Sequence, residues 1–589
     1  MEEFAIVESR DQSVTLTAPD ASGDRGTPGA PAVSCDSKGG VRGRCLLVAL
    51  LCLLSVVCYG HGLTDSGFDW PDEAIHAMDG VLIYDWVSAG PSAWAHPMAF
   101  ARQQYARYPA LGMGLHYPPG FAVVESGVYA VLGVSSVSAR VTVLLFAVLT
   151  VAGAFLLMDR TLGRPASVTG AVCLLAMPLV VHWSRQTMLE MPTLAAMVWS
   201  AVLFFRYLDR PTWGRALVFA LVTASIPFFK QPGIFLLPLL FVWALLAAVR
   251  RKVSGWHVLL ATLIIAVLVG PFFLATLMQQ GHVVELVGAQ RPWWDWFGLK
   301  SWATVVPWLF RGAGAAISVA AAIGLVVGLF RRDRVWVLAV AWLAAGLVFN
   351  VLVQHKEARF LVPTLLPVAL LVGVTAEALF RVLPVPAARL TAAAVVVVAA
   401  VVGFAYAKPE WRDSTHLVCS WRQHFEGDVA LYVGKREPDF IFAVRQTLGP
   451  QGPVILRGSK LFYTCASDPR YHYEGLVRDV NSVEEILEAY APAAIFVEDK
   501  VPFDLEEEKL VRQCLAASRH YQRVATVETI TRPHGGTNPV HVYLRTTPGE
   551  RTATELTLPI PLMGETITMP LSTLGVPQGP RPAQVDMKE

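Results

Sequence analysis

Runs of apolar residues, each long enough to cross a bilayer, dominate this sequence. A membrane-spanning helix needs roughly 17 to 25 predominantly apolar residues. We count eleven such runs, and only 16% of all residues are charged, whereas a soluble domain averages about 25%. The chain is therefore predicted to be a polytopic α-helical membrane protein. The predicted spans are 44–62, 141–158, 166–182, 191–208, 214–229, 233–249, 256–278, 313–330, 335–352, 361–380 and 387–407.

Arginine and lysine residues beside the spans indicate which loops face the cytoplasm. A twelfth apolar segment, 121–134, is shorter than the others and contains Glu125. If this segment does not cross, all the basic clusters lie on one face, whereas a crossing would move every cluster after the first to the other face. The excess of basic residues in cytoplasmic loops therefore favours eleven spans, with 121–134 as a juxtamembrane or re-entrant helix. We expect an inner (plasma) membrane protein with a cytoplasmic N-terminus and an extracytoplasmic C-terminus.

The composition divides the chain into four regions. Residues 1–43 are rich in Gly, Pro, Ser and charged residues and are predicted to be a disordered cytoplasmic tail. The transmembrane domain follows at 44–407. Residues 408–546 alternate strand-like and helical patterns, which predicts a small extracytoplasmic α/β domain. Residues 547–589 are rich in Pro and Thr and are expected to form a loose tail.

Within the predicted α/β domain, the strand-like runs are 429–433, 494–497 and 541–544, and the helical patterns are 482–490 and 505–518. Three of the eight cysteines also lie in this region of the chain, and the sequence leaves open whether two of them form a disulfide. These cysteines are Cys419, Cys465 and Cys514. The formal net charge of +2 gives no support for a nucleic-acid partner.

An acidic cluster follows the first span, where Asp69, Asp72 and Glu73 fall within five residues. Carboxylates at a membrane boundary are costly unless they meet water, a metal or a polar substrate. One interpretation is a general base with a metal ligand beside it. The other is a solvated loop whose acids stabilise the start of a helix, a common arrangement. The local pattern leaves both interpretations open.

Two further motifs lie in loops predicted to be external. His116 and Tyr117 precede two prolines that fix the backbone, which predicts a rigid corner, and both side chains are candidates to face a site. Arg185 and Glu190 lie in the loop after the third span. These two residues either belong to the site or pair with one another.

The string from His355 to Phe360 places three cations and one anion directly before an apolar span. The cations are His355, Lys356 and Arg359. On the external face they oppose the positive-inside rule, so we expect an anionic ligand such as a lipid phosphate. Lys230, also predicted to be external, fits the same role.

The placement of charge also bears on transport. A transporter is expected to carry ionisable residues near mid-membrane, inside broken helices. The predicted spans have no clear charge at mid-helix. A site at the outer interface is therefore favoured, and a polytopic transporter or lipid flippase remains the alternative.

The order of these motifs resembles the GT-C class of polytopic glycosyltransferases, which use polyprenyl-phosphate sugars. The Asp-Glu pair in the first external loop, the Tyr-Pro-Pro-Gly corner and the Ser-Arg…acid element resemble family 39 and the aminoarabinose transferase branch. The string at 355–360 is similar instead to a motif of the lipid-linked mannosyltransferases of family 22. The resemblance covers residues 44–407 and implies a membrane glycosyltransferase of the cell envelope, with a polyprenyl-phosphate sugar and membrane lipid as partners.

Residue by residue, the resemblance implies that Asp72 is the catalytic base and that Glu73 is its partner. It implies that Lys356 and Arg359 lie near the donor phosphate, where His355 and Lys230 are expected to join them. Glu190 stands where relatives usually carry Asp, and Arg185, His116 and Tyr117 are secondary site candidates. A divalent cation, Mg²⁺ or Mn²⁺, is expected to bind Asp72 and Glu190. The acceptor, whether protein, lipid or glycan, is not implied.

Overall fold

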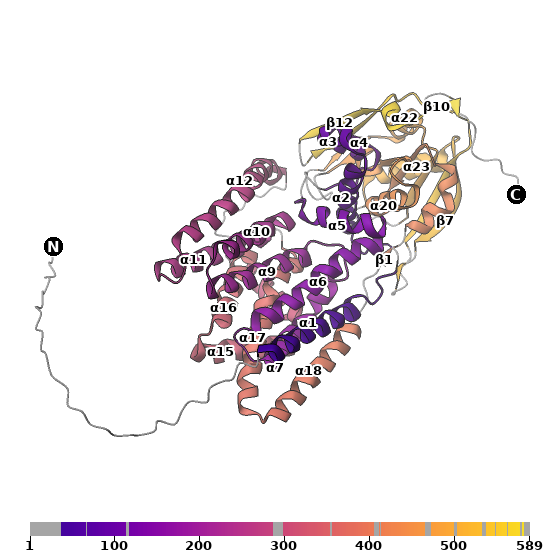
Figure 1. Cartoon of the computed structure of the whole chain (residues 1–589). Coiled ribbons are helices and arrows are strands. Elements are labelled where there is room, and N and C mark those ends of the chain that lie inside the picture. The colour runs from indigo at the N-terminus through magenta and orange to yellow at the C-terminus, as the bar shows by residue number, and fades with distance from the viewer. Residues whose placement is uncertain are drawn as a thin grey trace, which may run out of the picture. The chain divides into compact units, whose positions relative to one another are not determined.

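The computed structural model describes residues 37–581 except 66, 113–116, 287–297, 354–355, 406–410, 413, 466–472, 500–503, 530, 533–537, 548, 562–563 and 578–579. From residue 47 onwards, a large helical region is followed by a region that contains a mixed β-sheet (Figure 1). The predicted fold class, a polytopic helical protein with a C-terminal α/β domain, is confirmed.

A helix lies at each of the eleven predicted spans. Among the described residues, eight helices are by themselves long and apolar enough to cross a membrane. α14 (Leu299–Ala313) and α15 are bent by 106° and add a ninth if they form one span, whereas α7 and α10 are shorter apolar helices. The number of crossings stays a prediction. The helices at the predicted spans are α1 (Ser37–Tyr59), α6 (Ser136–Met158), α7 (Arg164–Ala176), α9 (Glu190–Asp209), α10 (Trp213–Phe229), α11 (Leu236–Val249), α12 (Gly255–Leu286), α15 (Ala315–Arg331), α16 (Arg334–Leu352), α17 (Val362–Val382) and α18 (Val385–Ala405).

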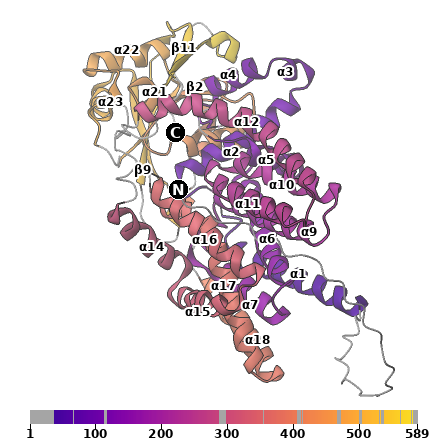
Figure 2. The ribbon, with the colours of Figure 1, turned by 90° about the vertical axis from the view of Figure 1, so that its left-hand side faces the viewer.

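α17 is the central helix of this region, packed against α7, α15 and α16 (Figure 2). Most of its apolar length is buried in protein, whereas most of α12 and α18 is exposed. Exposed apolar side chains on α12 and α18, such as Leu263 and Val398, are stable there only if lipid surrounds them. The apolar faces of the outer helices thus support the prediction of a multi-pass membrane protein.

The loop after α1 folds into four helices: α2 (Pro71–Ser88), α3 (Pro91–Ala95), α4 (Pro97–Arg107) and α5 (Gly120–Leu132). Proline is the first helical residue of α2, α3 and α4, where its fixed φ suits a helix start and its missing N–H is not needed. α5 has 13 residues and so extends about 20 Å at 1.5 Å per residue, less than the bilayer core. Its length agrees with the expected non-crossing helix at 121–134.

The C-terminal region contains a five-stranded sheet in the order β3-β2-β6-β9-β7. β3, β2 and β6 are parallel, and β9 and β7 continue the sheet in antiparallel fashion. All five residues of both β2 and β6 are buried, as expected for parallel strands covered on both faces. The strands are β2 (Val429–Val433), β3 (Val454–Arg457), β6 (Ala494–Glu498), β7 (Tyr521–Thr529) and β9 (Asn538–Arg545), and the main helices are α20 (Glu437–Leu448), α22 (Val480–Tyr490) and α23 (Glu506–Ala517).

In the C-terminal region the structure differs from one expectation and answers one open question. Part of the expected loose tail at 547–589 forms a hairpin of β11 (Glu555–Ile560) and β12 (Glu565–Pro570). Leu556, Leu558 and Ile560 alternate with more exposed residues and enter the core of the α/β region, a period-two pattern that the Pro and Thr content hid. Cys419, Cys465 and Cys514 are free thiols, so no disulfide joins them.

The loop after α1, which is predicted to be external, shares one hydrophobic core with the α/β region. α2 packs against both α5 and α20 (Figure 1). Phe68 meets Phe442 of α20 with ring centroids 5.0 Å apart, and Met78 is buried in the same cluster. The predicted boundary near residue 408 therefore separates the chain in sequence, while in space the loop that carries Asp72 packs against the C-terminal region.

Candidate active site

Charged side chains from four separate segments meet beside the start of α2. Arg359 Nη1 donates a hydrogen bond to Asp72 Oδ2 at 3.1 Å. The Nε of Arg359 lies 3.9 Å from Glu190 Oε1, and Lys230 Nζ pairs with that same oxygen. Asp72 and Glu190 lie in the first turns of α2 and α9, where the helix dipole favours negative charge. The structure thus joins Asp72, Glu190, Lys230 and Arg359, which we call the charged cluster.

The two cations of the charged cluster lie between helices. Lys230 connects α10 to the short helix η1 (Gln231–Phe235), and Arg359 lies in η2 (Ala358–Leu361), directly before α17. Both cations are also within cation–π range of the Phe360 ring, at 5.0 Å for Lys230 Nζ and 5.6 Å for the Arg359 guanidinium. Arg359 also pairs with Glu357, a residue of the same string that the sequence did not assign to the site.

Burial separates the roles of the two acids in the cluster. The Glu190 side chain is 1% exposed, whereas that of Asp72 is 31% exposed. Glu190 Oε2 is buried and, among the described residues, has no hydrogen-bond partner. Burial lowers the pKa of Lys230, while the Glu190 carboxylate acts in the opposite direction. Asp72 is thus the more accessible acid of the cluster, and Glu190 is the buried acid that pairs with Lys230 and Arg359.

Glu73 has a different role from Asp72. Its Oε1 accepts hydrogen bonds from the N–H groups of Asp69 at 2.8 Å and Trp70 at 3.0 Å, and its Oε2 accepts one from Thr187 N–H at 2.7 Å. The side chain is fully buried. Three backbone donors fill this carboxylate, which ties the start of α2 to the loop before α9. The structure therefore favours a positioning role for Glu73 over a direct part in the chemistry.

Two predicted site residues lie outside the charged cluster. Lys356 Nζ donates to the carbonyls of Val351 and Val353 at 2.9 and 2.6 Å, so it caps the end of α16. Arg185 donates to the carbonyls of Cys58 and Gly403 at 2.7 and 2.8 Å, which ties the loop before α9 to α1 and α18. The hydrogen bonds of both side chains thus go to backbone carbonyls of neighbouring elements.

Tyr117 lies beside the cluster and is half-buried. Burial and the negative charge of Asp72 raise its pKa well above the usual value. Its ring packs edge-on against His76, with centroids 4.2 Å apart. His76 is one helical turn after Asp72, so the i, i+4 spacing on α2 was the signal that could have indicated it. His116 and His355 lie outside the described residues.

A divalent cation bound by Asp72 and Glu190 was expected, and this stays a prediction. The guanidinium of Arg359 lies against both carboxylates and supplies the positive charge there. Across the described ranges, no group of three or more His, Cys, Asp or Glu side chains could hold a metal ion.

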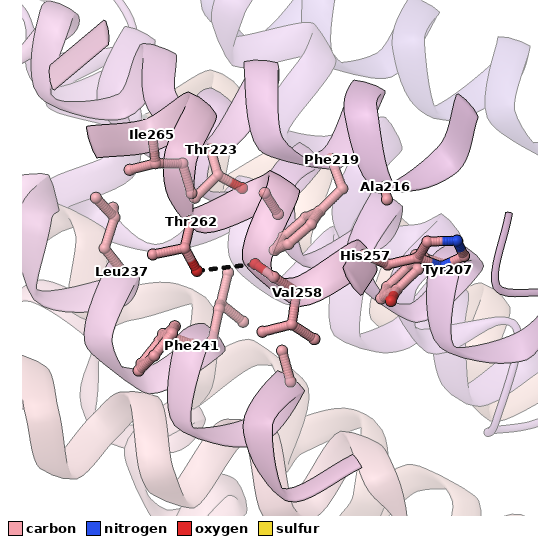
Figure 3. Close-up of a pocket in the computed structure, with 13 residues that line it drawn as sticks. Tyr207, Ala216, Phe219, Thr223, Leu237, Phe241, His257, Val258, Thr262 and Ile265 are labelled. Carbon is pink, nitrogen blue, oxygen red and sulfur yellow. Dashed lines mark hydrogen bonds between the residues drawn. The ribbon is translucent and has the colours of Figure 1, made fainter. Parts of the chain in front are cut away.

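A separate apolar cavity of about 30 Å³ lies between α9, α10, α11 and α12 (Figure 3). Leu237, Phe241 and Val258 line it, with His257 and Tyr207 side by side at one end. Thr262 turns its hydroxyl back to the Val258 carbonyl at 2.9 Å. This cavity contains none of the residues of the charged cluster.

Two solved structures of ArnT from Cupriavidus metallidurans are similar to this chain in overall fold. The structure in the apo state has a TM-score of 0.56 at 16% sequence identity, covering 85% of this chain and 98% of that one. The structure bound to undecaprenyl phosphate has a TM-score of 0.54 at 15% identity, covering 86% and 98%. The fold is ArnT-like.

The ArnT-like fold is accompanied by a partial family match. Residues 116–274 match the sequence model of the Dolichyl-phosphate-mannose-protein mannosyltransferase family. This segment includes Glu190 and Lys230 but not Asp72 or Arg359. A comparison with curated proteins finds no match. The two matches support the GT-C class that the motifs resemble, while the likeness of 355–360 to family 22 stays a prediction.

Proposed function

We propose that the protein is a membrane glycosyltransferase that moves a sugar from a polyprenyl-phosphate donor to an acceptor hydroxyl. The observation that carries this proposal is the meeting of Asp72 with two cations, Arg359 and Lys230, within an ArnT-like fold. One of the ArnT structures is bound to undecaprenyl phosphate, and the partial family match is to mannosyltransferases that are named for a polyprenyl-phosphate donor. Both support the same class of donor for this chain.

In the proposed reaction, Asp72 acts as the general base. It takes the proton of the acceptor hydroxyl as that oxygen attacks the anomeric carbon of the donor sugar. The bond between the anomeric carbon and the phosphate oxygen breaks, and the phosphate leaves with the electron pair. Asp72 suits this role because it is the more exposed acid of the charged cluster and belongs to a helix whose start is firmly held.

The leaving phosphate gains negative charge, which Arg359 and Lys230 would stabilise. Without donor, both cations are engaged by carboxylates, with Arg359 against Asp72 and Lys230 against Glu190. A phosphate that takes up the guanidinium would release Asp72 to accept a proton. Donor binding and activation of the base are therefore coupled through one arginine. Divalent-cation dependence stays a prediction that activity in the presence of a chelator measures, and no step above requires it.

We propose that this chemistry takes place on the extracytoplasmic face, because the basic clusters favour a cytoplasmic N-terminus. A reporter fused after residue 408 tests this orientation. A signal from the cytoplasm would overturn it, together with the count of eleven spans.

Asp72→Asn is the direct test of the base. We expect transfer from a polyprenyl-phosphate sugar to fall at least about a hundredfold, because a general base contributes typically 10² to 10⁴. Asp209→Asn is the matched control. Asp209 is similarly exposed, at 33%, and also pairs with an arginine, Arg334 at 2.8 Å, but it lies at the far end of α9 from Glu190. The control is expected to retain activity.

Wild-type-like transfer by Asp72→Asn in correctly inserted protein would remove Asp72 from the role of base. Movement of lipid or solute across the membrane by the wild type, without any sugar transfer, would instead support the alternative of a transporter or lipid flippase.

A further inference from the structure

The C-terminal sheet has a place where α/β domains commonly bind a ligand. In open α/β sheets this place lies outside the carboxyl ends of the parallel strands, where the strand order reverses. The chain leaves β2 towards β3 on one side, while β6 adjoins β2 on the other. The switch point therefore lies between β2 and β6. Glu498 is the last residue of β6, and Arg436 lies in the turn that follows β2.

The protein's own first external loop fills this switch point. Arg436 Nη2 donates to the carbonyl of Phe68 at 2.5 Å, and its Nη1 donates to the carbonyl of Asp69 at 2.6 Å. The arginine is buried and also pairs with Asp439 on α20. Glu498 Oε1 accepts a hydrogen bond from the Arg436 N–H at 2.6 Å, which fixes the turn that carries the arginine.

The same loop is also held from the membrane side. Glu73 accepts the N–H groups of Asp69 and Trp70, while Gln186 Nε2 donates to Asp69 Oδ2 at 3.0 Å. The carbonyls of Phe68 and Asp69 are thus held by the C-terminal region, and the N–H groups of Asp69 and Trp70 are held by α2 itself. α2 begins at Pro71, directly after this loop, and Asp72 is its second residue. A shift of the loop would therefore move Asp72.

We propose that Arg436 is a positioning residue for Asp72, and that the switch point of the C-terminal sheet holds the catalytic loop. This inference rests on the proposed function for the role of Asp72. The α/β region then contributes to catalysis, because the Arg436 guanidinium fixes the backbone of the residues that precede α2. Misplacing a reacting group by about 1 Å can cost a hundredfold in rate, so the hold on two carbonyls has a measurable consequence.

Arg436→Lys tests the proposal, because lysine keeps the charge beside Asp439 but lacks the fork that reaches two carbonyls. Arg445→Lys is the matched control. Arg445 is equally buried on α20 and grips Asp85 of α2 with two nitrogens, far along the helix from Asp72. Turnover, donor KM, thermal stability and amide hydrogen exchange in residues 67–75 are measured for both variants of the full chain.

We expect Arg436→Lys to lower kcat about tenfold or more, with the donor KM within about twofold of wild type, and to speed exchange in residues 67–75. Arg445→Lys is expected to lose at least as much thermal stability while keeping its kcat. A wild-type kcat for Arg436→Lys would overturn the proposal, as would kcat losses that follow thermal stability equally in both variants.

The exchange measurement does not depend on the reaction. If Asp72→Asn proves active, Asp72 is not the base, yet unchanged exchange in residues 67–75 of Arg436→Lys would still overturn the positioning role by itself. If Arg436→Lys does not fold, Glu498→Gln replaces it, since it keeps the side-chain shape and weakens the hold on the Arg436 N–H. Faster hydrogen exchange in residues 67–75 is expected for Glu498→Gln too. Unchanged exchange in this variant would contradict the proposal.

Discussion

Arg359 is the residue on which the charged cluster depends, because three carboxylates share its guanidinium. These are Asp72, Glu190 and Glu357. A guanidinium can serve several acceptors at once, since it presents five donors in a rigid plane. It remains charged at any accessible pH. In the proposed mechanism, the same guanidinium that pairs with Asp72 also receives the phosphate of the donor.

Lys230 and Lys356 were both predicted to lie near the donor phosphate, but their surroundings in the structure differ. Lys230 pairs with Glu190 in the cluster, whereas Lys356 caps α16. We expect Lys230→Met to raise the donor KM about tenfold, because a hydrogen bond to a charged group contributes about 1.5 to 3 kcal/mol. Lys356→Met is expected to leave KM unchanged and to lower the free energy of unfolding by about 1 kcal/mol. Equal increases in KM would contradict this assignment.

Among the elements, the helices that the apolar periodicity predicted lie where they were expected, and β2, β6 and β9 lie at the predicted strand-like runs, whereas β3 and β7 were not predicted. The hairpin β11–β12 was missed, because Thr and Pro outweighed a short alternating pattern. The bend between α14 and α15 was also missed. Gly314 lies at that bend with φ +87°, a conformation that suits glycine. A single glycine in the sequence does not by itself indicate a bend between two helices.

α23 carries a prediction about pH. Glu508 is buried on this helix and accepts a hydrogen bond from Tyr463 Oη at 3.2 Å. Burial, reinforced by Glu437, raises its pKa to about 7. Because the folded state holds the proton more tightly than the unfolded state, this contribution to stability is complete below about pH 4.5 and is lost as the pH rises through about 7. We expect the free energy of unfolding to fall by about 3 kcal/mol over that window.

Thermal unfolding between pH 5 and pH 8 measures this effect. Glu508→Gln removes the ionisable group and should flatten the dependence. Glu506→Gln, on the exposed first residue of the same helix, should leave it as in the wild type. An undiminished slope in Glu508→Gln would show that another group is responsible.

At the scale of the whole molecule, the membrane helices and the α/β region are joined through α2. Its buried face shares a core with Phe442 and Ile441 of α20, and Arg445 pairs with Asp85 across the same contact. Breaking one partner of a buried ion pair costs about 3 to 5 kcal/mol, and the apolar contacts add to this. The C-terminal region therefore stabilises the loop that carries the site.

A chain that ends at residue 407 tests this dependence. We expect it to lose both activity and a monodisperse, protease-resistant fold in detergent, because the core around α2 would be exposed. Full-length Asp72→Asn is the control, since it should be inactive yet folded. A truncated chain that is stable and active would show that the two regions fold independently.

The sequence by itself determined the fold class, the positions of the apolar helices and most strands of the sheet, because hydrophobic periodicity is a local property that burial enforces. It also indicated Asp72, Glu190, Lys230 and Arg359 as residues of interest. Only the tertiary structure decided which of the polar residues meet. Lys356 and Arg185 donate hydrogen bonds to backbone carbonyls, and Glu73 accepts them from backbone N–H groups. The sequence did not indicate Arg436, whose contact with the loop before α2 appears only in the structure. The reason is physical: a buried charge takes whichever partner the fold brings within hydrogen-bonding distance, and for Arg185 and Arg436 that partner is distant in sequence.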